Sequence, residues 1–390
     1  MTALAQEFKV IDTDTHIIEP YDLWTSRVSK KWGDQVPHVK WDERKQEDAW
    51  FFGTNRVSAA AGAAHAGFDK YPPSRPQRLD QAQKYTWDAK ERLKVMDEYG
   101  IHAQILYPNV AGFGAGEYLA LGDKELMLAC VQAYNDWITE WASADPKRLV
   151  PQMALPFWDV QTCVVEMQRM VKHGHKGVVM CGEPEHFKLP KLTDPHWDPL
   201  WAAAQEMGLP INFHIGTGDM FYYKMMHRGV GRHAHFASMG ALFSMDNAKV
   251  IAQLICGGVC HRFPSLNFVS VESGVGWLPY LLDGLDYQWK NCGVAEEHPE
   301  YKLLPSEFFK RQFYGSFWFE ERTLKSAIEQ LGADNILYET DFPHPTSMSP
   351  GPCSSAVKPS QYIELALKGI SREDAGKILY GNAARIYHLD

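Results

Sequence analysis

Long apolar runs are missing from this 390-residue sequence, because Asp, Glu, Lys or Pro interrupts every apolar stretch. None approaches the roughly eighteen residues that a membrane-spanning helix needs. The N-terminus, MTALAQEFKVIDTD, also lacks the basic start, apolar core and small-residue cleavage site of a secretory signal. We therefore expect no transmembrane segment and a cytoplasmic protein.

Paired cysteines and an excess of basic residues are missing too. The seven cysteines include no CxxC pair, and the closest two, Cys256 and Cys260, stand among apolar residues. This pattern favours buried thiols over disulfides or a cysteine metal site. With 39 Lys and Arg against 48 Asp and Glu, the net charge of −9 repels phosphate backbones. We expect neither nucleic acid nor an anionic membrane as a partner.

Eight short apolar or β-branched runs recur along the chain, with helix-like stretches between them. The composition, 45% hydrophobic and 22% charged, is that of an ordinary globular domain. Alternating strands and helices indicate βα units and a parallel sheet. The runs cover residues 8–12, 102–107, 149–155, 176–180, 210–215, 266–271, 312–317 and 335–340. Eight such units predict an α/β fold, the (β/α)8 TIM barrel, as a single domain over residues 1–390.

The segments between these runs are of two kinds, helix-like and irregular. Residues 89–100, 197–208 and 322–332 have helix-spaced apolar residues and end at glycine, a common helix terminus. Residues 28–86 show little helical or strand periodicity, which predicts an insertion after the first strand, over the barrel mouth. The long connections 216–248 and 342–361 are expected to be lids or substrate walls, with irregular packing as an equal alternative.

Potential metal ligands stand at the ends of three predicted strands. Asp14 and His16 are two residues apart on the first strand and share one face with Asp12. His214 ends the fifth run, and Asp341 follows the eighth. Each alone is more often structural, as a turn, a core-edge histidine or a loop start. Together, at matching strand ends of a barrel, these carboxylates and imidazoles favour a site for Zn or Mn.

Several motifs together resemble the amidohydrolase superfamily, in the amidohydrolase 2 branch that includes aminocarboxymuconate semialdehyde decarboxylase and hydroxybenzoate-type decarboxylases. They are IDTDTH, NFHIGTG, FPSLNFVSVESGVGWLP, YETDFPHP and YGNAARIY, and they span nearly the whole chain. The resemblance implies one divalent metal, Zn²⁺ first and Mn²⁺ as the alternative, and a homodimer. It further implies that the metal ligands are Asp14, His16, His214 and Asp341.

Glu272 departs from the family pattern, because the decarboxylases usually have histidine at the end of strand six. A carboxylate there could be a further ligand, a general base, a hydrogen-bonding partner or a structural helix cap. His344, three residues after Asp341, could donate to substrate or orient a ligand, but its flanking prolines favour a rigid-loop role equally. The catalytic candidates are therefore Asp341, Glu272, His214 and His344.

Weaker candidates lie near strand ends or in the long loop after the fifth strand. An aromatic pocket, or simple packing, is expected for Trp24, Tyr107, Asn109, Phe157, Trp158 and Phe317. A substrate carboxylate could meet Arg232, His233 or His235, which could equally be solvated. Helix-face positions in the core or at a dimer contact are expected for Trp277 and Tyr280.

Three functions remain open from the residues. The resemblance implies decarboxylation, or a related C–C cleavage, of a small aromatic or unsaturated carboxylic acid, with Asp341 protonating the ring or alkene carbon. The second is hydrolysis of an amide, ester, lactone or C–C bond through metal-bound hydroxide. The third is a non-catalytic metal-binding barrel, which a closed site with no open coordination position would favour.

Overall fold

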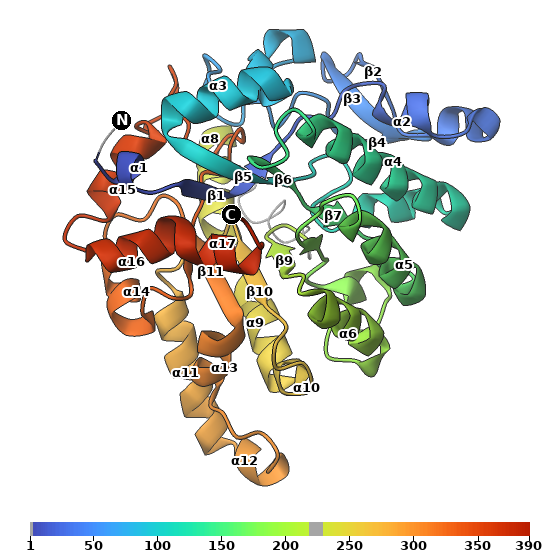
Figure 1. Cartoon of the computed structure of the whole chain (residues 1–390). Coiled ribbons are helices and arrows are strands. Elements are labelled where there is room, and N and C mark those ends of the chain that lie inside the picture. The colour runs from blue at the N-terminus through green and yellow to red at the C-terminus, as the bar shows by residue number, and fades with distance from the viewer. Residues whose placement is uncertain (1–2, 218–228) are drawn as a thin grey trace.

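The computed structural model describes residues 3–217 and 229–390, and its centre is a closed ring of parallel strands (Figure 1). Hydrogen bonds join the strands in the orders β1-β5-β6 and β12-β11-β10-β9-β8-β7. The strands are β1 (Val10–His16), β5 (Ile101–Tyr107), β6 (Leu149–Pro151), β7 (Met153–Ala154), β8 (Val178–Val179), β9 (Ile211–His214), β10 (Phe268–Val271), β11 (Phe313–Phe317) and β12 (Ile336–Tyr338).

Two junctions close the ring. Strands β6 and β7 are halves of one strand, separated only by Gln152. On the opposite side, the Asp341 amide donates to the Asp14 carbonyl and the His16 amide donates to the Phe342 carbonyl, which joins the end of β12 to β1. Eight strand positions therefore form the ring, and the predicted TIM barrel is confirmed.

Helices surround the strands, and the three predicted from periodicity are confirmed as α3, α6 and α14. The longer helices are α3 (Ala89–Tyr99), α4 (Lys124–Ala142), α5 (Val160–Val171), α6 (Asp198–Met207), α8 (Arg232–Phe243), α9 (Asn247–Cys256), α11 (Leu278–Asn291), α13 (Pro305–Gln312), α14 (Thr323–Leu331) and α15 (Pro359–Ala366). The short ones are α1 (Ala3–Glu7), α2 (Leu23–Arg27), α10 (Val259–Arg262), α12 (Val294–Glu297), α16 (Arg372–Gly376), α17 (Asn382–Ile386), η1 (Lys30–Gln35), η2 (Leu79–Gln81), η3 (Lys84–Thr86), η4 (Gly116–Leu121), η5 (Pro184–Phe187), η6 (Pro195–Trp197) and η7 (Lys377–Gly381).

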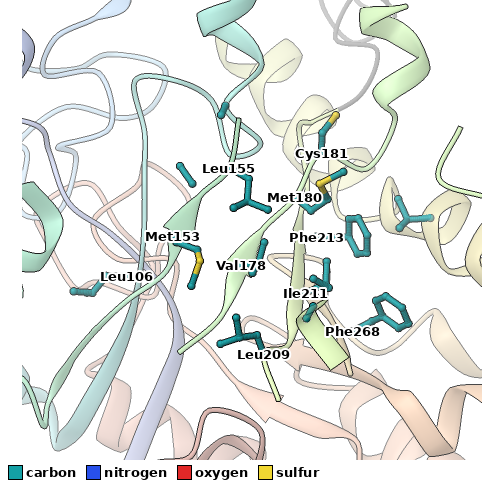
Figure 2. Close-up of a cluster of buried hydrophobic side chains, with 14 of the residues drawn as sticks. Leu106, Met153, Leu155, Val178, Met180, Cys181, Leu209, Ile211, Phe213 and Phe268 are labelled. Carbon is teal, nitrogen blue, oxygen red and sulfur yellow. The ribbon is translucent and has the colours of Figure 1, made fainter. Parts of the chain in front are cut away.

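The core has two layers because successive strand residues face opposite sides of the ring. Val178 and Phe268 belong to the layer between strands and helices, part of which Figure 2 shows. Their neighbours Val179 and Val269 belong to a separate cluster inside the ring. Helix α17 lies across the centre of the barrel in Figure 1, and Tyr387, which follows it, donates from its hydroxyl to Asn212 Oδ1 at 2.6 Å. The C-terminus thus closes one end of the barrel, opposite the ends of the strands that carry the candidate ligands.

The expectation of little helical or strand structure in residues 28–86 was wrong for part of this segment. Strands β2 (His38–Asp42), β3 (Glu47–Phe52) and β4 (Asn55–Ala59) form an antiparallel sheet at the rim. The strands are short, and β2 and β4 are only half-buried, so their alternation is weak in the sequence. Trp24 packs edge-on against Trp50 of this sheet, with ring centroids 4.9 Å apart. Its indole donates to the Cys130 carbonyl, so Trp24 is a core residue and not a pocket residue.

The two long connections are partly helical and partly irregular, and both contribute residues to the wall of one cavity. Helix α8 and the start of α9 lie within 216–248, while positions 218–228 lie outside the described residues. The 342–361 connection is irregular up to α15. Among the described helices, none combines the length and apolar character needed to cross a bilayer.

Arg92 of α3 is fully buried beneath the end of β1. Its guanidinium donates to the carbonyls of Tyr85, Thr86 and His16 and lies 4.3 Å from the ring centroid of Phe342. We expect Arg92→Leu to lower the free energy of unfolding by about 3–5 kcal/mol, because buried carbonyls lose their donors. Urea denaturation of this variant beside Arg92→Lys, which retains a cation, measures the effect. Equal stability of Arg92→Leu and wild type would contradict it.

Candidate metal centre

Six buried side chains at the ends of the barrel strands converge on one point. Asp14 and His16 lie on β1, His214 ends β9, Glu272 follows β10, and Asp341 follows β12. Their donor atoms form two overlapping groups of four, each with all donor atoms within 4.8 Å of one another. The groups are Asp14, His16, His214 and Glu272, and His16, Glu272, Asp341 and His344. Glu272 belongs to both groups although the predicted ligand set omitted it.

Backbone carbonyls orient the two central imidazoles. His16 Nδ1 lies 3.0 Å from the Pro108 carbonyl oxygen, and His214 Nδ1 lies 2.9 Å from that of Ile215. Because a carbonyl only accepts, each Nδ1 carries a proton, and when a ring is neutral its Nε2 presents a lone pair. The two Nε2 atoms face each other at 3.1 Å. Two facing lone pairs require a cation or a proton between them.

Burial and neighbouring charges set the ionisation of the cluster. Burial, and then His344, lower the pKa of His16 to about 3, so this ring is neutral. Burial alone would raise the pKa of Asp14, but His214 and His16 outweigh it and hold the pKa below its usual value. Burial and Asp341 raise the pKa of Glu272, and burial and Asp14 raise that of Asp341. The crowded carboxylates cannot all ionise without a compensating cation.

The residues fit a divalent metal. Neither carboxylate oxygen of Asp14 accepts a hydrogen bond from the described residues, although both are buried. His16 Nε2 lies 3.3 Å from Asp14 Oδ1, and His214 Nε2 lies 3.3 Å from Glu272 Oε2. Ligand bonds of about 2.0–2.2 Å place neighbouring ligands about 3.0–3.5 Å apart. Mixed imidazole and carboxylate donors suit both Zn and Mn.

Two of the acidic residues have left-handed backbones, with φ of 54° at Glu272 and 56° at Asp341. This region is costly for residues with a side chain, and such strain concentrates at functional sites. At both residues, the left-handed backbone conformation directs the carboxylate from the end of its strand into the cluster. Asp12, by contrast, accepts from the Thr340 amide at 2.8 Å and the Thr340 hydroxyl at 2.6 Å. Asp12 therefore joins β1 to the end of β12 and stays outside the cluster.

His344 connects the cluster to Asn109. Its ring stacks on that of His16, with centroids 3.8 Å apart, and its Nδ1 lies 2.7 Å from Asp341 Oδ1. Asn109 Nδ2 donates to the Ile17 carbonyl, so Asn109 Oδ1 faces His344 and accepts from its Nε2 at 2.7 Å. A neutral His344 protonated on Nε2 has a lone pair on Nδ1, so its short contact with Asp341 favours a protonated Asp341, the direction in which burial and Asp14 move the pKa of Asp341.

A cavity of about 490 Å³ lies over the cluster, and both Glu272 and His344 line it. Its apolar and aromatic wall includes Val110, Phe113, Ile215, Phe236, Met239, Phe243 and Trp318. Two cations from the rim segment, Arg56 and Arg75, also line it, and both are paired with the buried Glu47. The cavity therefore combines an aromatic surface with two guanidinium groups at fixed positions.

Of the weaker candidates, only Asn109 lines this cavity. Tyr107 packs near His214, with ring centroids 5.7 Å apart, while Phe157 and Phe317 pack in the core. Trp158 packs against that core without lining the cavity. In the loop after β9, Arg232 lines a separate hollow and His233 contacts the Pro72 carbonyl. His235 is half-buried. At α11, Trp277 donates to the Ser273 carbonyl and Tyr280 is 86% exposed.

The sequence did not single out Arg56, Arg75 and most of the apolar wall of the cavity, and it also missed Phe113, Glu339 and Glu19. Phe113 packs on His214, with ring centroids 3.8 Å apart. Glu339 accepts from the Glu272 amide, and Glu19 lines the cavity. Two carried a weak signal, since Glu339 stands two residues before Asp341 and Glu19 three after His16. Phe113 stands in a glycine-rich loop whose position no local pattern defines.

The family comparison agrees with this geometry. The amidohydrolase family profile matches residues 11–389, nearly the whole chain. The chain belongs to the amidohydrolase family. The resemblance inferred from the motifs is confirmed, and so is the expectation that the chain is an enzyme of this metal-dependent superfamily.

Known amidohydrolase relatives cover most of the chain. A gamma-resorcylate decarboxylase from Polaromonas sp. strain JS666 is 26% identical over 338 residues, covering 83% of this chain and 94% of the relative. A solved amidohydrolase from Mycobacterium avium subsp. paratuberculosis K-10 has a TM-score of 0.76 at 24% identity, over 97% of this chain and 99% of that chain. A dihydroxybenzoic acid decarboxylase from Polaromonas sp. JS666, solved with manganese and the inhibitor 2-nitroresorcinol, has a TM-score of 0.64 at 20% identity, covering 98% and 97%. At these identities the structural likenesses bear on the fold alone.

Proposed function

We propose that this amidohydrolase is a metal-dependent carboxy-lyase that removes carbon dioxide from a small aromatic or unsaturated carboxylic acid. One observation carries the proposal: a buried cluster of imidazoles and carboxylates opens into a cavity with an aromatic wall and two arginines. The wall suits a planar apolar body, and the imidazoles and carboxylates of the cluster suit a divalent metal that would hold the carboxylate of the acid. The decarboxylase activity of the 26% identical relative supports the same reaction class.

The ligands of one divalent metal would be Asp14, His16, His214 and Asp341. We propose Zn²⁺ first, with Mn²⁺ as the alternative, because both accept nitrogen and oxygen donors. When bound, such an ion would hold the substrate's carboxylate side and stabilise negative charge there. Glu272 would act beside these ligands, as a further ligand or as a base, because it stands within reach of His214, at 3.3 Å.

The proton for the reaction would come from the Asp341–His344 pair, whose Oδ1–Nδ1 contact is 2.7 Å. Asn109 holds the far side of His344, so the pair cannot rotate away from the cavity. The proton passes to the carbon that bears the carboxylate. The bond to the carboxylate then breaks, its electron pair restores the double bond of the ring or alkene, and carbon dioxide leaves. Solvent returns a proton to the pair.

Removing the metal tests the proposal. After dialysis against a chelator we expect a lower melting temperature and no turnover, and added Zn²⁺ or Mn²⁺ restores both. Bound metal at about 100 times its dissociation constant contributes about 2.7 kcal/mol to folding. Carbon dioxide release from hydroxybenzoates and muconate-like acids is the activity measurement, with metal content determined by plasma mass spectrometry.

The other outcomes separate the alternatives. A folded protein that refuses both ions would overturn the metal centre. A metal-loaded protein that hydrolyses esters or lactones but releases no carbon dioxide would be a hydrolase. Metal binding without any turnover would indicate a non-catalytic barrel.

Further proposals concern the domain organisation, the cellular location and the oligomeric state of the protein. The chain would act as a single domain, with residues 28–86 as a wall of the substrate cavity, since Arg56 and Arg75 of this segment line it. It would form a cytoplasmic homodimer, for which the exposed Tyr280 and Tyr287 of α11 offer an apolar contact face. Light scattering of the purified protein measures the oligomeric state.

A further inference from the structure

Helix α8 presents an apolar face to the substrate cavity. The α8 residues that line the cavity are Phe236, Met239, Gly240 and Phe243. They stand at positions i, i+3, i+4 and i+7, so they share one side of the helix. All four are half-buried, and within the part of the chain that the structure describes, none of the α8 residues is buried. This face therefore borders the cavity and not the hydrophobic core.

Helix α9, which follows α8, shows how an apolar helix face usually packs in this fold. Its residues Val250, Ile251, Leu254 and Ile255 are at most 4% exposed and belong to the core between strands and helices. An apolar helix face that stays half-exposed beside a cavity is instead typical of a ligand-binding wall. The α8 face thus has the composition of a core-facing helix but lies where a ligand can contact it.

At Gly240 the α8 face borders the groups proposed to deliver the proton. A methyl group added at Gly240 would lie 3.8 Å from Thr346 Cγ2, an ordinary van der Waals distance. The Thr346 hydroxyl donates to Asp341 Oδ2 at 2.8 Å. Both Gly240 and Thr346 line the cavity. A side chain at position 240 would therefore begin between two residues of the cavity wall and fill cavity space.

At Phe243 the same face borders the histidine side of the cluster. A methyl group added at Gly216 would lie 3.9 Å from Phe243 Cζ and 3.7 Å from the ring of Phe113. Phe113 packs on His214, with ring centroids 3.8 Å apart. The apolar surface of α8 is therefore continuous with the aromatic surface that covers the cluster.

The α8 face is longer than one aromatic ring. From Phe236 to Phe243 it covers about two helical turns, or about 10 Å along the helix axis. The cavity of about 490 Å³ has the size of sites that bind drug-sized molecules, and benzoate would fill only part of it. An acid bound at the cluster therefore leaves apolar wall uncovered unless it carries a further apolar group.

The two arginines of the cavity are already paired with carboxylates of the rim segment. Arg56 donates to Asp42 and Glu47, and Arg75 donates to both oxygens of Glu47. Glu47 itself is 5% exposed. A second anionic group of a substrate would have to compete with these carboxylates. An uncharged apolar group beside α8 meets no such competition.

We propose that the α8 face is a subsite for an apolar substituent of the substrate acid, either an alkyl chain or a second ring. The inference rests on the proposed function for the acid itself. With the carboxylate at the cluster, the substituent extends along α8 from Gly240 toward Phe236. Gly240 determines specificity, because its missing side chain leaves the room that the substituent occupies. An acid without such a substituent leaves the face in water and binds more weakly.

Binding of alkyl-substituted probes tests the subsite without turnover. The protein loaded with Zn²⁺ or Mn²⁺ is titrated calorimetrically with benzoate and with its methyl, propyl and butyl derivatives at ring positions 3 and 4. In at least one of the two series we expect binding about threefold tighter for each added carbon, close to full burial of a methylene. The butyl derivative should then exceed benzoate by about 30- to 100-fold. Isophthalate and terephthalate, which carry a second carboxylate at the same positions, should bind no tighter than benzoate.

Gly240→Leu should remove this gain. The leucine side chain would fill the space in front of residue 240, so the advantage of the butyl derivative over benzoate should fall at least about tenfold. Ala241→Leu is the matched control, because Ala241 is the next residue of α8, is exposed and does not line the cavity. It adds the same side chain to the outer side of the helix and should retain the wild-type gain.

Three outcomes overturn the inference. If wild type binds benzoate and both alkyl series equally, no apolar substituent is recognised, whether or not Gly240→Leu folds. An unchanged gain in Gly240→Leu would place the alkyl chain elsewhere. Tighter binding of isophthalate or terephthalate than of the butyl derivatives would assign the cavity to a second anionic group.

The subsite and the proposed reaction can fail separately. An alkyl preference that Gly240→Leu abolishes and Ala241→Leu retains, in a protein that releases no carbon dioxide, supports the subsite and rejects the decarboxylation. Carbon dioxide release by a protein without an alkyl preference supports the decarboxylation and rejects the subsite.

Discussion

Replacing His214 with alanine is expected to remove most of the bound metal and all measurable activity. His214 Nε2 faces His16 Nε2 at 3.1 Å and Glu272 Oε2 at 3.3 Å, so it stands at the centre of the first donor group. Loss of an outer-shell partner alone typically costs about 10- to 100-fold in metal affinity, and loss of a ligand should exceed this. Plasma mass spectrometry beside an activity assay measures both quantities.

His175→Ala provides a matched control for the loss of a buried histidine. His175 is 2% exposed, and its Nε2 contacts the Thr139 hydroxyl at 2.8 Å, away from the cluster. This variant should keep wild-type metal content even if it is less stable. Unchanged metal content and activity in His214→Ala would refute the ligand assignment.

Asp341→Asn should separate ligation from proton transfer. Asp341 lies 3.6 Å from His16 Nε2 and 2.7 Å from His344 Nδ1, so it can contact the metal and share a proton. Asparagine retains an oxygen donor but cannot release a proton as a carboxylic acid does. We expect the turnover rate to fall about 10²- to 10⁴-fold, the usual contribution of general acid catalysis. Metal content should fall far less.

A variant with a smaller expected loss of rate provides a reference for Asp341→Asn. Thr346→Val removes the hydroxyl that donates to Asp341 Oδ2 at 2.8 Å and leaves the carboxyl group in place. The loss of one hydrogen bond should lower the rate by about tenfold or less. If metal content and rate fall together in Asp341→Asn, Asp341 is a ligand only and the proton comes from another group.

Local patterns in the sequence were enough for the barrel and for most of the cluster. Apolar residues recur every two positions in a half-buried strand and about every 3.6 positions in a helix. Their spacing therefore distinguishes the two kinds of element in the sequence. Parallel strands of a closed ring end on one face, so polar residues after β1, β9 and β12 could be placed together without coordinates. Asp14, His16, His214 and Asp341 were named on that basis. The structure places the first three in one buried donor group with Glu272, and Asp341 in a second group that shares His16 and Glu272 with the first.

Contacts between distant segments determined the rest. The bonds between Glu19 and Asn109 cross 90 residues, and the proximity of Glu272 to two donor groups depends on a left-handed backbone after β10. The rim sheet was also missed, because half-buried strands pair through backbone groups that every residue carries. Periodicity and motifs in a sequence reflect interactions between residues that are close together in the chain. Which side chains line a cavity depends on the packed chain, because burial and the contacts between distant segments exist only after folding.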